Sequence, residues 1–383
     1  MRRQRIELSE IGDWDNLVLA TWKAARGKRL RPDVATFLDD LDGNLSRLAE
    51  DIVRERAPRG TYREFSIRDP KPRQIHAACF EDRVLHHAIL NVTEAVFERA
   101  LVDSTFACRP GKGVHRAVAM VQSWSRRCPW YVQVDVDGYF PSIPHDLLLQ
   151  RLGRKFKGHG FLRLLARIVD SYHASPGLGL PIGSLTSQHF ANLYLDGADR
   201  FLLGHPDVQG HVRYMDDIAW WCRDQTAARR TLREFGEYIG DVCRLRLKPA
   251  VRINRSAQGM SYCGYRVTPD RILLGPRKRR RFRTLRQRWE LTWETGLIDD
   301  RQLQSAFDSV LAITAHSDSR RWRQRELQLR PSRYIEDPGW GSKAPTACCA
   351  AAPGSTTAGT RVPPTATTTI PATATTTSVS ALP

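Results

Sequence analysis

The stretch His211-Val-Arg-Tyr-Met-Asp-Asp-Ile-Ala-Trp-Trp-Cys222 places two adjacent carboxylates, Asp216 and Asp217, between two apolar runs. The run from Ile218 to Cys222 is rich in residues that favour β-structure. The whole stretch therefore predicts a strand, a tight turn and a second strand. Two acids at the tip of a hydrophobic hairpin repel one another unless a positive charge lies nearby. A solvated turn is the simplest interpretation of this pair when it is considered alone.

A third acid upstream changes that interpretation. Asp135 lies near the end of a β-rich run in the stretch Trp130-Tyr-Val-Gln-Val-Asp-Val-Asp-Gly-Tyr-Phe140. Oxygen ligands are those that a hard cation such as Mg²⁺ prefers, and separate strands can supply them to a shared site. Asp135, Asp216 and Asp217 are therefore the candidate catalytic and metal-binding residues.

The charge balance of the chain indicates a polyanionic partner. The 383 residues include 59 Lys and Arg against 41 Asp and Glu, a net charge of +18. Such an excess is typical of proteins that bind nucleic acid or an acidic membrane surface. The most basic run is Arg277-Lys-Arg-Arg-Arg-Phe-Arg-Thr-Leu-Arg-Gln-Arg288, with eight basic residues in twelve positions. It predicts a nucleic-acid-binding or solvated helical face.

The sequence offers no sign of a membrane or secreted protein. No stretch approaches 18 uncharged apolar residues, and the N-terminal residues lack the apolar segment of a secretory signal. The eight cysteines are scattered without the spacing of a zinc site. We expect reduced thiols, a cytoplasmic location and no membrane partner.

The predicted elements indicate an α+β fold. Two amphipathic helices are expected within residues 14–56, a Pro-containing hairpin over 62–76 and a helix over 81–99. From 130 to 267 the predicted order is β, α, loop-α, ββ, α, β, β, with one helix over 189–203. That order predicts a split βαβ-type antiparallel sheet with helices on one face. Residues 344–383 consist almost entirely of Ala, Thr, Pro, Ser and Gly, which predicts a disordered tail.

Five stretches resemble, in the same order, the motifs of reverse transcriptases. Tyr214-Met-Asp-Asp217 is similar to their signature, and Asp135 with Phe140 to their first catalytic motif. Arg68-Asp-Pro-Lys-Pro-Arg-Gln-Ile75 is similar to their fingers hairpin. Gly179–Leu195 is similar to their template- and nucleotide-proximal motif. Tyr262-Cys-Gly-Tyr-Arg266 is similar to their primer grip.

The resemblance covers about residues 60–290 and implies a right-hand polymerase fold. Its expected parts are an N-terminal helical extension (1–58), fingers (59–130), a palm that is the catalytic core (131–268) and a small basic helical thumb (269–335).

The resemblance also implies roles for individual residues. Asp135 and Asp216 would bridge two Mg²⁺ ions, with Mn²⁺ as an alternative, aided by the carbonyl of Val136, and Asp217 would lie near the primer terminus. Phe140 would exclude a ribose 2′-hydroxyl. The family usually has a lysine at the position of Val251, so Lys248 or Arg252 would have to replace it as proton donor to pyrophosphate. The remaining nucleotide-binding residues would be Lys71, Arg73, Ile182, Gly183 and Gln188. The expected primer- and template-binding residues are Tyr214, Met215, Gly264, Tyr265, Arg277, Lys278, Arg279, Arg280, Arg281 and Arg283.

The pair Ser187-Gln188 indicates a subtype. Group II intron enzymes and retrons typically have Ser-Pro here, whereas Ile182-Gly-Ser-Leu-Thr-Ser-Gln188 is similar to the enzymes of diversity-generating retroelements. This resemblance implies an RNA-directed DNA polymerase that copies a template-repeat RNA with dNTPs and makes errors at template adenines. Its partners would be the template RNA, the RNA/DNA duplex and a small basic helical accessory protein. The alternatives are a retron-like or phage-defence reverse transcriptase and a catalytically inactive nucleic-acid-binding module.

The tail adds an inference from the genetic code. Back-translated and read in another frame, Cys348-Cys-Ala-Ala-Ala-Pro-Gly354 can encode Val-Leu-Arg-Gly-Gly-Ser-Trp, and the threonine runs can encode asparagines. The hidden frame resembles the ending of a variable protein with a C-type-lectin fold. We hypothesise that the 3′ end of the gene overlaps a template repeat; an ordinary Thr/Pro-rich linker is the alternative.

Overall fold

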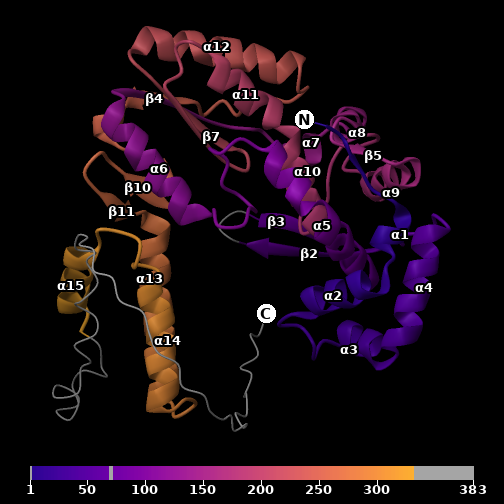
Figure 1. The fold of residues 1–383 in the computed structure, drawn as a ribbon. Coiled ribbons are helices and arrows are strands. Elements are labelled where there is room, and N and C mark those ends of the chain that lie inside the picture. Colours follow the sequence, from indigo (N-terminus) through magenta and orange to yellow (C-terminus); the bar gives the residue numbers. More distant parts are fainter. Residues whose placement is uncertain (1, 69–71, 332–383) are drawn as a thin grey trace, which may run out of the picture. The chain divides into compact units, whose positions relative to one another are not determined.

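A four-stranded antiparallel sheet carries the Asp-Asp hairpin (Figure 1). The computed structural model describes residues 2–68 and 72–331. The strand order is β6 (Gly210–Tyr214), β7 (Asp217–Cys222), β4 (Trp130–Asp135) and β8 (Arg252–Arg255). The register places Asp217 opposite both Asp135 and Tyr214. The α+β class is confirmed, and the pairing brings the two carboxylate-bearing strands to one end of the sheet.

Both faces of this sheet are covered, so the expectation of helices on one face is wrong. Successive side chains of a strand point to opposite faces. Val132, Val134, Ile218 and Trp220 belong to the larger apolar core, where α12 (Gln225–Asp241) packs against β4, β7 and β8. The alternate side chains Tyr131, Val212, Ala219 and Trp221 belong to a second core. There they meet α6 (Val114–Arg127) and the three-stranded sheet of β9 (Met260–Tyr262), β10 (Tyr265–Val267) and β11 (Ile272–Leu274).

The N-terminal helices differ in number from the prediction. Residues 14–56 form three helices rather than two: α2 (Trp14–Ala25), α3 (Pro32–Asp39) and α4 (Leu41–Val53). Pro32 occupies the first turn of α3, where its missing N–H costs nothing. Asp40 then ends α3 and caps α4 by accepting a hydrogen bond from the Gly43 N–H at 3.2 Å. A short α1 (Leu8–Ile11) precedes them, and β1 (Gln4–Arg5) pairs in parallel with β5 (Phe156–Lys157).

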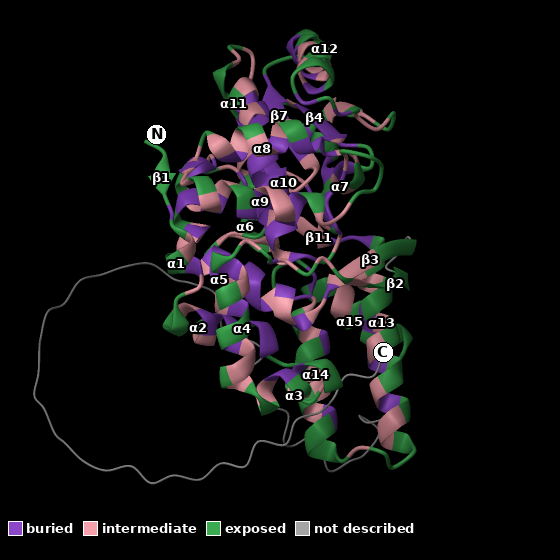
Figure 2. Ribbon diagram, turned by 90° about the vertical axis from the view of Figure 1, so that its right-hand side faces the viewer, coloured by how far each residue is buried: buried purple, intermediate pink, exposed green. Residues whose placement is uncertain are grey.

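The expected hairpin and the helix after it are present. Strands β2 (Tyr62–Arg68) and β3 (Pro72–Ala78) pair antiparallel, and α5 (Phe80–Ala100) follows. The next elements are α7 (Tyr139–Ser142), α8 (His145–Gly153) and α9 (His159–Asp170). The single helix predicted over 189–203 is two, α10 (Leu185–Tyr194) and α11 (Asp196–Gly204), interrupted at Leu195. Figure 2 shows that buried residues concentrate in the sheet and in the helices packed on it.

Three further helices follow the second sheet. They are α13 (Pro276–Glu294), α14 (Asp300–Ala312) and α15 (Arg320–Leu329), in agreement with the helical character expected for 269–335. The predicted tail, 344–383, lies outside the described residues. Among those that are described, no helix is both long enough and apolar enough to cross a bilayer.

Candidate active site

The acidic turn joins β6 to β7 through two residues, Met215 and Asp216. Met215 has a φ of 59°, in the left-handed region that non-glycine residues seldom occupy. The buried side chain of Arg213 stabilises this turn, because its Nη1 donates to the carbonyl of Met215 at 3.0 Å. A side chain two residues before the turn's first residue thus fixes the carboxylate-bearing backbone.

Arg213 is itself held by a fully buried ion pair. Its Nε and Nη2 each donate to Asp199 at 2.7 Å, and neither side chain is exposed to solvent. The Nε2 of His211 lies 3.2 Å from the same carboxylate, and Asn192 accepts two further bonds from Arg213. Burial alone would raise the pKa of Asp199, but Arg213 and His211 outweigh it and lower that pKa. The pair stays charged inside the core and rigidly links α11 to the turn.

Like charges crowd the end of the sheet. Burial, followed by the charge of Asp135, raises the pKa of Asp216. Burial is also the main cause that raises the pKa of Asp217 to about 7, although Gln133 Nε2 donates to its Oδ1 at 2.9 Å. Such a site favours a bound cation, which would remove the repulsion.

One cation of the chain already lies against these acids. The backbone N–H of Lys248 donates to the carbonyl of Asp135 at 2.8 Å, and its Nζ donates to Asp135 Oδ1. Leu247 pairs antiparallel with Val136, so the segment before β8 runs alongside the end of β4. Asp137 is exposed, and its N–H bonds to the carbonyl of Arg246.

The acidic turn opens into a cleft of about 1120 Å³. Its walls come from the β2–β3 hairpin, the segment after β4, the loop before α10, the β9–β10 turn and α13. The predicted residues that line it are Arg73, Val136, Phe140, Ile182, Gly183, Gln188, Tyr214, Met215, Asp216, Asp217, Lys248, Gly264, Arg277, Lys278 and Arg281. Asp135 adjoins the cleft through Lys248.

Residues Ile182 and Gly183 are placed by the hairpin beside them. The N–H of His76 in β3 donates to the carbonyl of Ile182 at 2.9 Å. A Cβ on Gly183, whose φ is +113°, would lie 2.9 Å from the Ile75 side chain. Only glycine therefore allows this close approach of loop and hairpin.

Several predicted contacts with nucleic acid are not brought to the cleft. Tyr265 is buried, and the Lys278 Nζ lies 4.3 Å above its ring centre. Arg279 lies over the Trp322 ring at 5.7 Å. Arg283 pairs with Glu326 of α15 at 2.6 Å, so it joins two helices. Arg280 is exposed and does not line the cleft, and Lys71 lies outside the described residues.

Some lining residues were not predicted. Gln133, His76, Tyr172 and Ser261 all contact or line the site. Gln133 could have been found, because it lies two positions before Asp135 in one strand and so faces the same side of the sheet. The others come from distant segments that no local pattern connects to the carboxylates.

The donor set fits hard divalent cations. Asp135 and Asp216 offer carboxylate oxygens from two strands, and the amine of Lys248 stands where a cation would reach Asp135. Within residues 2–68 and 72–331, the three aspartates do not gather into one compact group of metal ligands. Asp217 is instead turned toward Gln133, at the side of the cleft where Ser261 lies.

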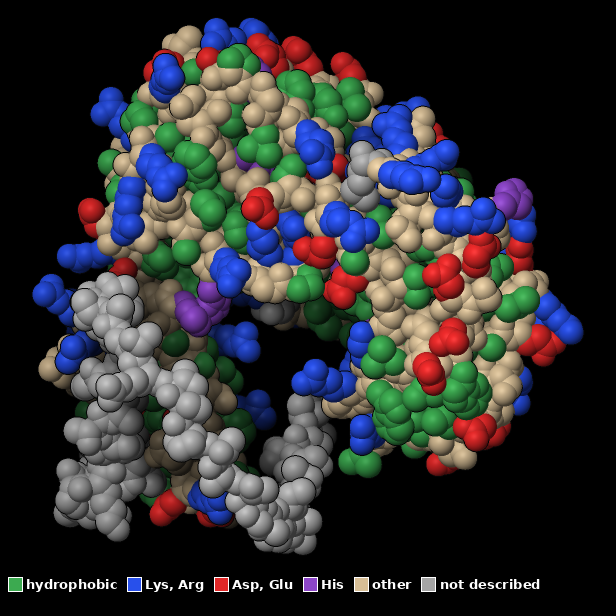
Figure 3. Space-filling view, viewed as in Figure 1, with side chains coloured by type: hydrophobic (Ala, Val, Ile, Leu, Met, Phe, Trp, Pro, Cys, Tyr) green, Lys and Arg blue, Asp and Glu red, His purple; other side chains and the backbone are tan. Residues whose placement is uncertain are grey.

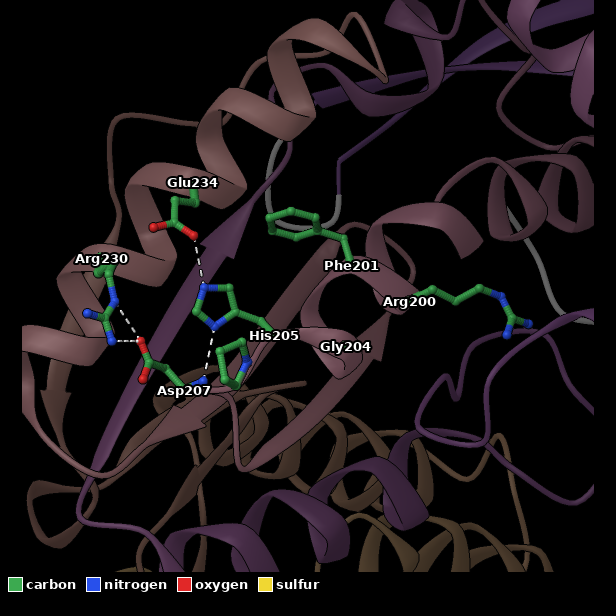
Figure 4. A pocket seen from close by; sticks show the side chains of 8 residues that line it. Arg200, Phe201, Gly204, His205, Asp207, Arg230 and Glu234 are labelled. Carbon is green, nitrogen blue, oxygen red and sulfur yellow. Dashed lines mark hydrogen bonds and ion pairs between the residues drawn. The ribbon is translucent and has the colours of Figure 1, made fainter.

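A second depression, of about 540 Å³, lies on the side of α11 and α12 (Figure 4). Its charged groups are paired with one another. His205 Nε2 bonds to Glu234 at 2.9 Å, and Arg230 Nε to Asp207 at 2.7 Å. Arg200 points away from this group. The depression therefore lacks the unneutralised acids of the main cleft.

A family model described as "Reverse transcriptase (RNA-dependent DNA polymerase)" matches residues 67–266, just over half of the chain. The chain belongs to the reverse transcriptase family. The matched range contains the three aspartates, strand β3 and the loop before α10, so the acidic part of the candidate site of this reverse transcriptase lies inside the family domain.

Three curated proteins are similar to this reverse transcriptase. They are the "Uncharacterized 91 kDa protein in cob intron" of Schizosaccharomyces pombe (28% identical, 39% of this chain), Protein YkfC of Escherichia coli (25%, 44%) and the group II intron-encoded protein LtrA of Lactococcus lactis (24%, 44%). The matches cover 19%, 47% and 30% of those proteins, less than half of each. The similarity therefore concerns a shared domain.

Proposed function

We propose that the chain is an active RNA-directed DNA polymerase whose catalytic residues are Asp135, Asp216 and Asp217. The observation that carries the proposal is the meeting of β4 with the β6–β7 turn at the floor of a basic cleft. Fingers (59–130), palm (131–268) and thumb (269–335) would then surround a primer and an RNA template, with residues 1–58 as an N-terminal extension.

The aspartates would hold two Mg²⁺ ions, which supply a Lewis acid for the attacking 3′-hydroxyl and for the leaving pyrophosphate. Asp135 and Asp216, with the Val136 carbonyl, are the proposed ligands. Asp217 lies to the side, against Gln133, where a primer end would contact it. Arg73 lines the cleft, and its charge acts on Asp216, so it can meet a triphosphate.

Phe140 and the loop before α10 would select the nucleotide. Phe140 lines the cleft partly exposed, and its carbonyl accepts the N–H of Leu180 at 2.9 Å. Its ring stands edge-on to Tyr139 with 5.7 Å between ring centres. A ring at this position would meet a ribose 2′-hydroxyl, which would favour dNTPs.

Primer extension on an RNA template with Mg²⁺ tests the activity. Replacing Asp216 by Asn removes a ligand charge worth several kcal/mol, so we expect at least a ~10³-fold loss of rate. Asp137→Asn is the matched control, because Asp137 is exposed and two residues from Asp135; it should retain most of the activity. Full activity of Asp216→Asn would remove the assignment, and an inert wild-type chain would favour an inactive nucleic-acid-binding module.

We further propose the diversity-generating subtype, which rests on the Ile182–Gln188 segment at the start of α10. Gln188 lines the cleft and accepts a hydrogen bond from Cys108 Sγ at 3.2 Å. The expected substrate is a template-repeat RNA copied with errors at adenines. Sequencing of cDNA should show misincorporation concentrated opposite adenines. Errors spread evenly over the four template bases, with no repeat pair in the flanking DNA, would favour a retron-like or phage-defence enzyme.

A further inference from the structure

Three side chains outside the cleft form a cluster that the polymerase reaction does not use. His145 begins α8, Asp170 ends α9 and His173 follows three residues later. One ligand atom from each lies within 4.8 Å of the others. Among the described residues this is the one group of three His, Cys, Asp or Glu side chains that meets so closely.

The hydrogen bonds of His145 define where its lone pair points. His145 is 4% exposed, and its Nε2 lies 2.7 Å from the carbonyl of Gly179. A carbonyl only accepts, so Nε2 carries the proton and Nδ1 of the neutral ring carries the lone pair. Metal-binding histidines usually have this second-nitrogen bond to a carbonyl, which fixes the ring and its tautomer.

The free nitrogen of His145 faces an acid. Nδ1 is buried without a hydrogen-bond partner and lies 3.4 Å from Asp170 Oδ1. Two electron-rich atoms at this distance repel one another unless a cation lies between or beside them. In tetrahedral coordination with bonds of about 2.0–2.1 Å, ligand atoms are roughly 3.4 Å apart. The observed separation therefore matches a shared metal ion.

His173 completes the set from an exposed loop. Its ring centre is 4.8 Å from that of His145, and its Nδ1 accepts a long bond of 3.3 Å from the Gly177 N–H. Coordination exchanges that weak bond for a metal bond, and the exposed ring can move the short distance required. Two imidazoles and one carboxylate suit Zn²⁺ or a similar transition metal, unlike the oxygen set of the catalytic cleft.

We propose that His145, Asp170 and His173 bind one divalent transition-metal ion such as Zn²⁺, with water as the fourth ligand. The site fastens the loop that leads into the nucleotide-selecting segment. In that loop the Gly177 carbonyl accepts from the His145 N–H at 2.9 Å, and the Gly179 N–H donates to Ile143 at 2.8 Å. The ion would stabilise the start of α8, the end of α9 and this loop together.

Metal content of the untagged full-length protein tests the proposal independently of polymerase activity. The wild type and variants are dialysed against Zn²⁺ in excess Mg²⁺, which occupies the catalytic aspartates, and the bound zinc is measured. The wild type should hold one equivalent more than His173→Ala and Asp170→Asn, whose side chains are exposed enough for the fold to tolerate the change. His159→Ala, an exposed histidine at the other end of α9, should match the wild type.

Co²⁺ reports the geometry. The wild type and His159→Ala should show the intense visible absorption of tetrahedral Co²⁺, and His173→Ala should lose it. Added Zn²⁺ should raise the melting temperature of the wild type in a concentration-dependent manner, but not that of His173→Ala. Equal zinc content and equal Co²⁺ spectra in the wild type and both ligand variants would overturn the proposal, leaving a proton between His145 and Asp170.

Discussion

Arg213 shows how a single buried residue supports the catalytic turn. Arg213 donates two hydrogen bonds to Asp199 and one to the carbonyl of Met215. The backbone of Met215 lies in a sparsely populated conformation. Residues in such conformations persist where their surroundings hold them firmly. We therefore assign Arg213 a positioning role, since its side chain is fully buried beneath the turn.

Replacing Arg213 by Met should destabilise the protein by about 3–5 kcal/mol, because Asp199 would be left buried and unpaired. The double change Arg213→Met with Asp199→Leu removes both charges and should recover much of that stability. Neither variant has a donor to the Met215 carbonyl. In both, the concentration of Mg²⁺ needed for half-maximal primer extension should therefore be higher than in the wild type. Urea unfolding measures the first effect and Mg²⁺ titration the second. A double variant with wild-type Mg²⁺ dependence would show that Arg213 serves stability alone.

At the scale of elements, a buried histidine joins α5 to the start of α10. His86 is 2% exposed, and its Nδ1 lies 3.2 Å from the hydroxyl of Ser184, which precedes α10. Burial lowers the pKa of His86 from 6.5 to about 3. The unfolded chain therefore binds one more proton than the folded chain between these values. Stability from this group is complete above pH 6.5 and is lost as the pH falls toward 3.

As the pH falls from 6.5 toward 3, the His86 effect should lower the free energy of unfolding by about 1.4 kcal/mol per pH unit. Carboxylates titrate in the same range, so the effect is read as a difference between variants. In urea unfolding at pH 7 and pH 5, His86→Gln should lose less stability than the wild type. His159→Ala, in which the removed histidine is exposed, should follow the wild type. Equal losses in all three proteins would contradict a neutral buried His86.

At the scale of the whole molecule, the Lys and Arg side chains that give the net charge of +18 differ in what they contact. Lys and Arg side chains are spread over the face drawn in Figure 3, and several border the hollow in that view. Along α13, Arg277, Lys278 and Arg281 line the cleft. Arg283, two residues later, pairs with Glu326 and fixes α15. Neighbouring cations on one helix thus divide between ligand binding and folding.

RNA binding should weaken steeply with salt, because each neutralised phosphate releases counterions. Arg281→Ala should lower the slope of log affinity against log salt by about one. Arg283→Ala is the matched comparison: it should leave the slope nearly unchanged and lower the melting temperature instead. Fluorescence anisotropy at several salt concentrations and a thermal melt distinguish the two. A slope that falls equally in both variants would place Arg283 on the RNA.

Much of this arrangement could be predicted from local pattern. The Asp-Asp turn and the Asp135 strand can be recognised because β-rich runs adjoin their acids. The order of the predicted elements indicates the α+β fold. Helix α6 was missed although Val114, Ala117, Val118 and Val121 recur at helical spacing, the pattern that could have revealed it. That omission also caused the error about the second face of the sheet.

The supporting contacts could not be predicted. Arg213 and Asp199 lie in different elements, and a lone arginine beside a tyrosine in a strand predicts nothing about a buried partner. Likewise Arg283 is indistinguishable in sequence from Arg281, because both belong to one basic run. Only the docking of α15 separates them. Local sequence predicts which residues line the cleft better than it predicts which residues hold them in place.

Because Lys248 Nζ donates to Asp135 Oδ1, a metal ion that bound this oxygen would compete with the lysine for it. If Asp135 is a metal ligand as proposed, a divalent ion at that oxygen would displace the ammonium group, which would then be available to the phosphates of a nucleotide. By thermodynamic reciprocity, a polyphosphate that draws Lys248 away raises the affinity for the ion by the same factor. One lysine would thereby couple metal binding to substrate binding, and in the structure it is the internal counterion of Asp135.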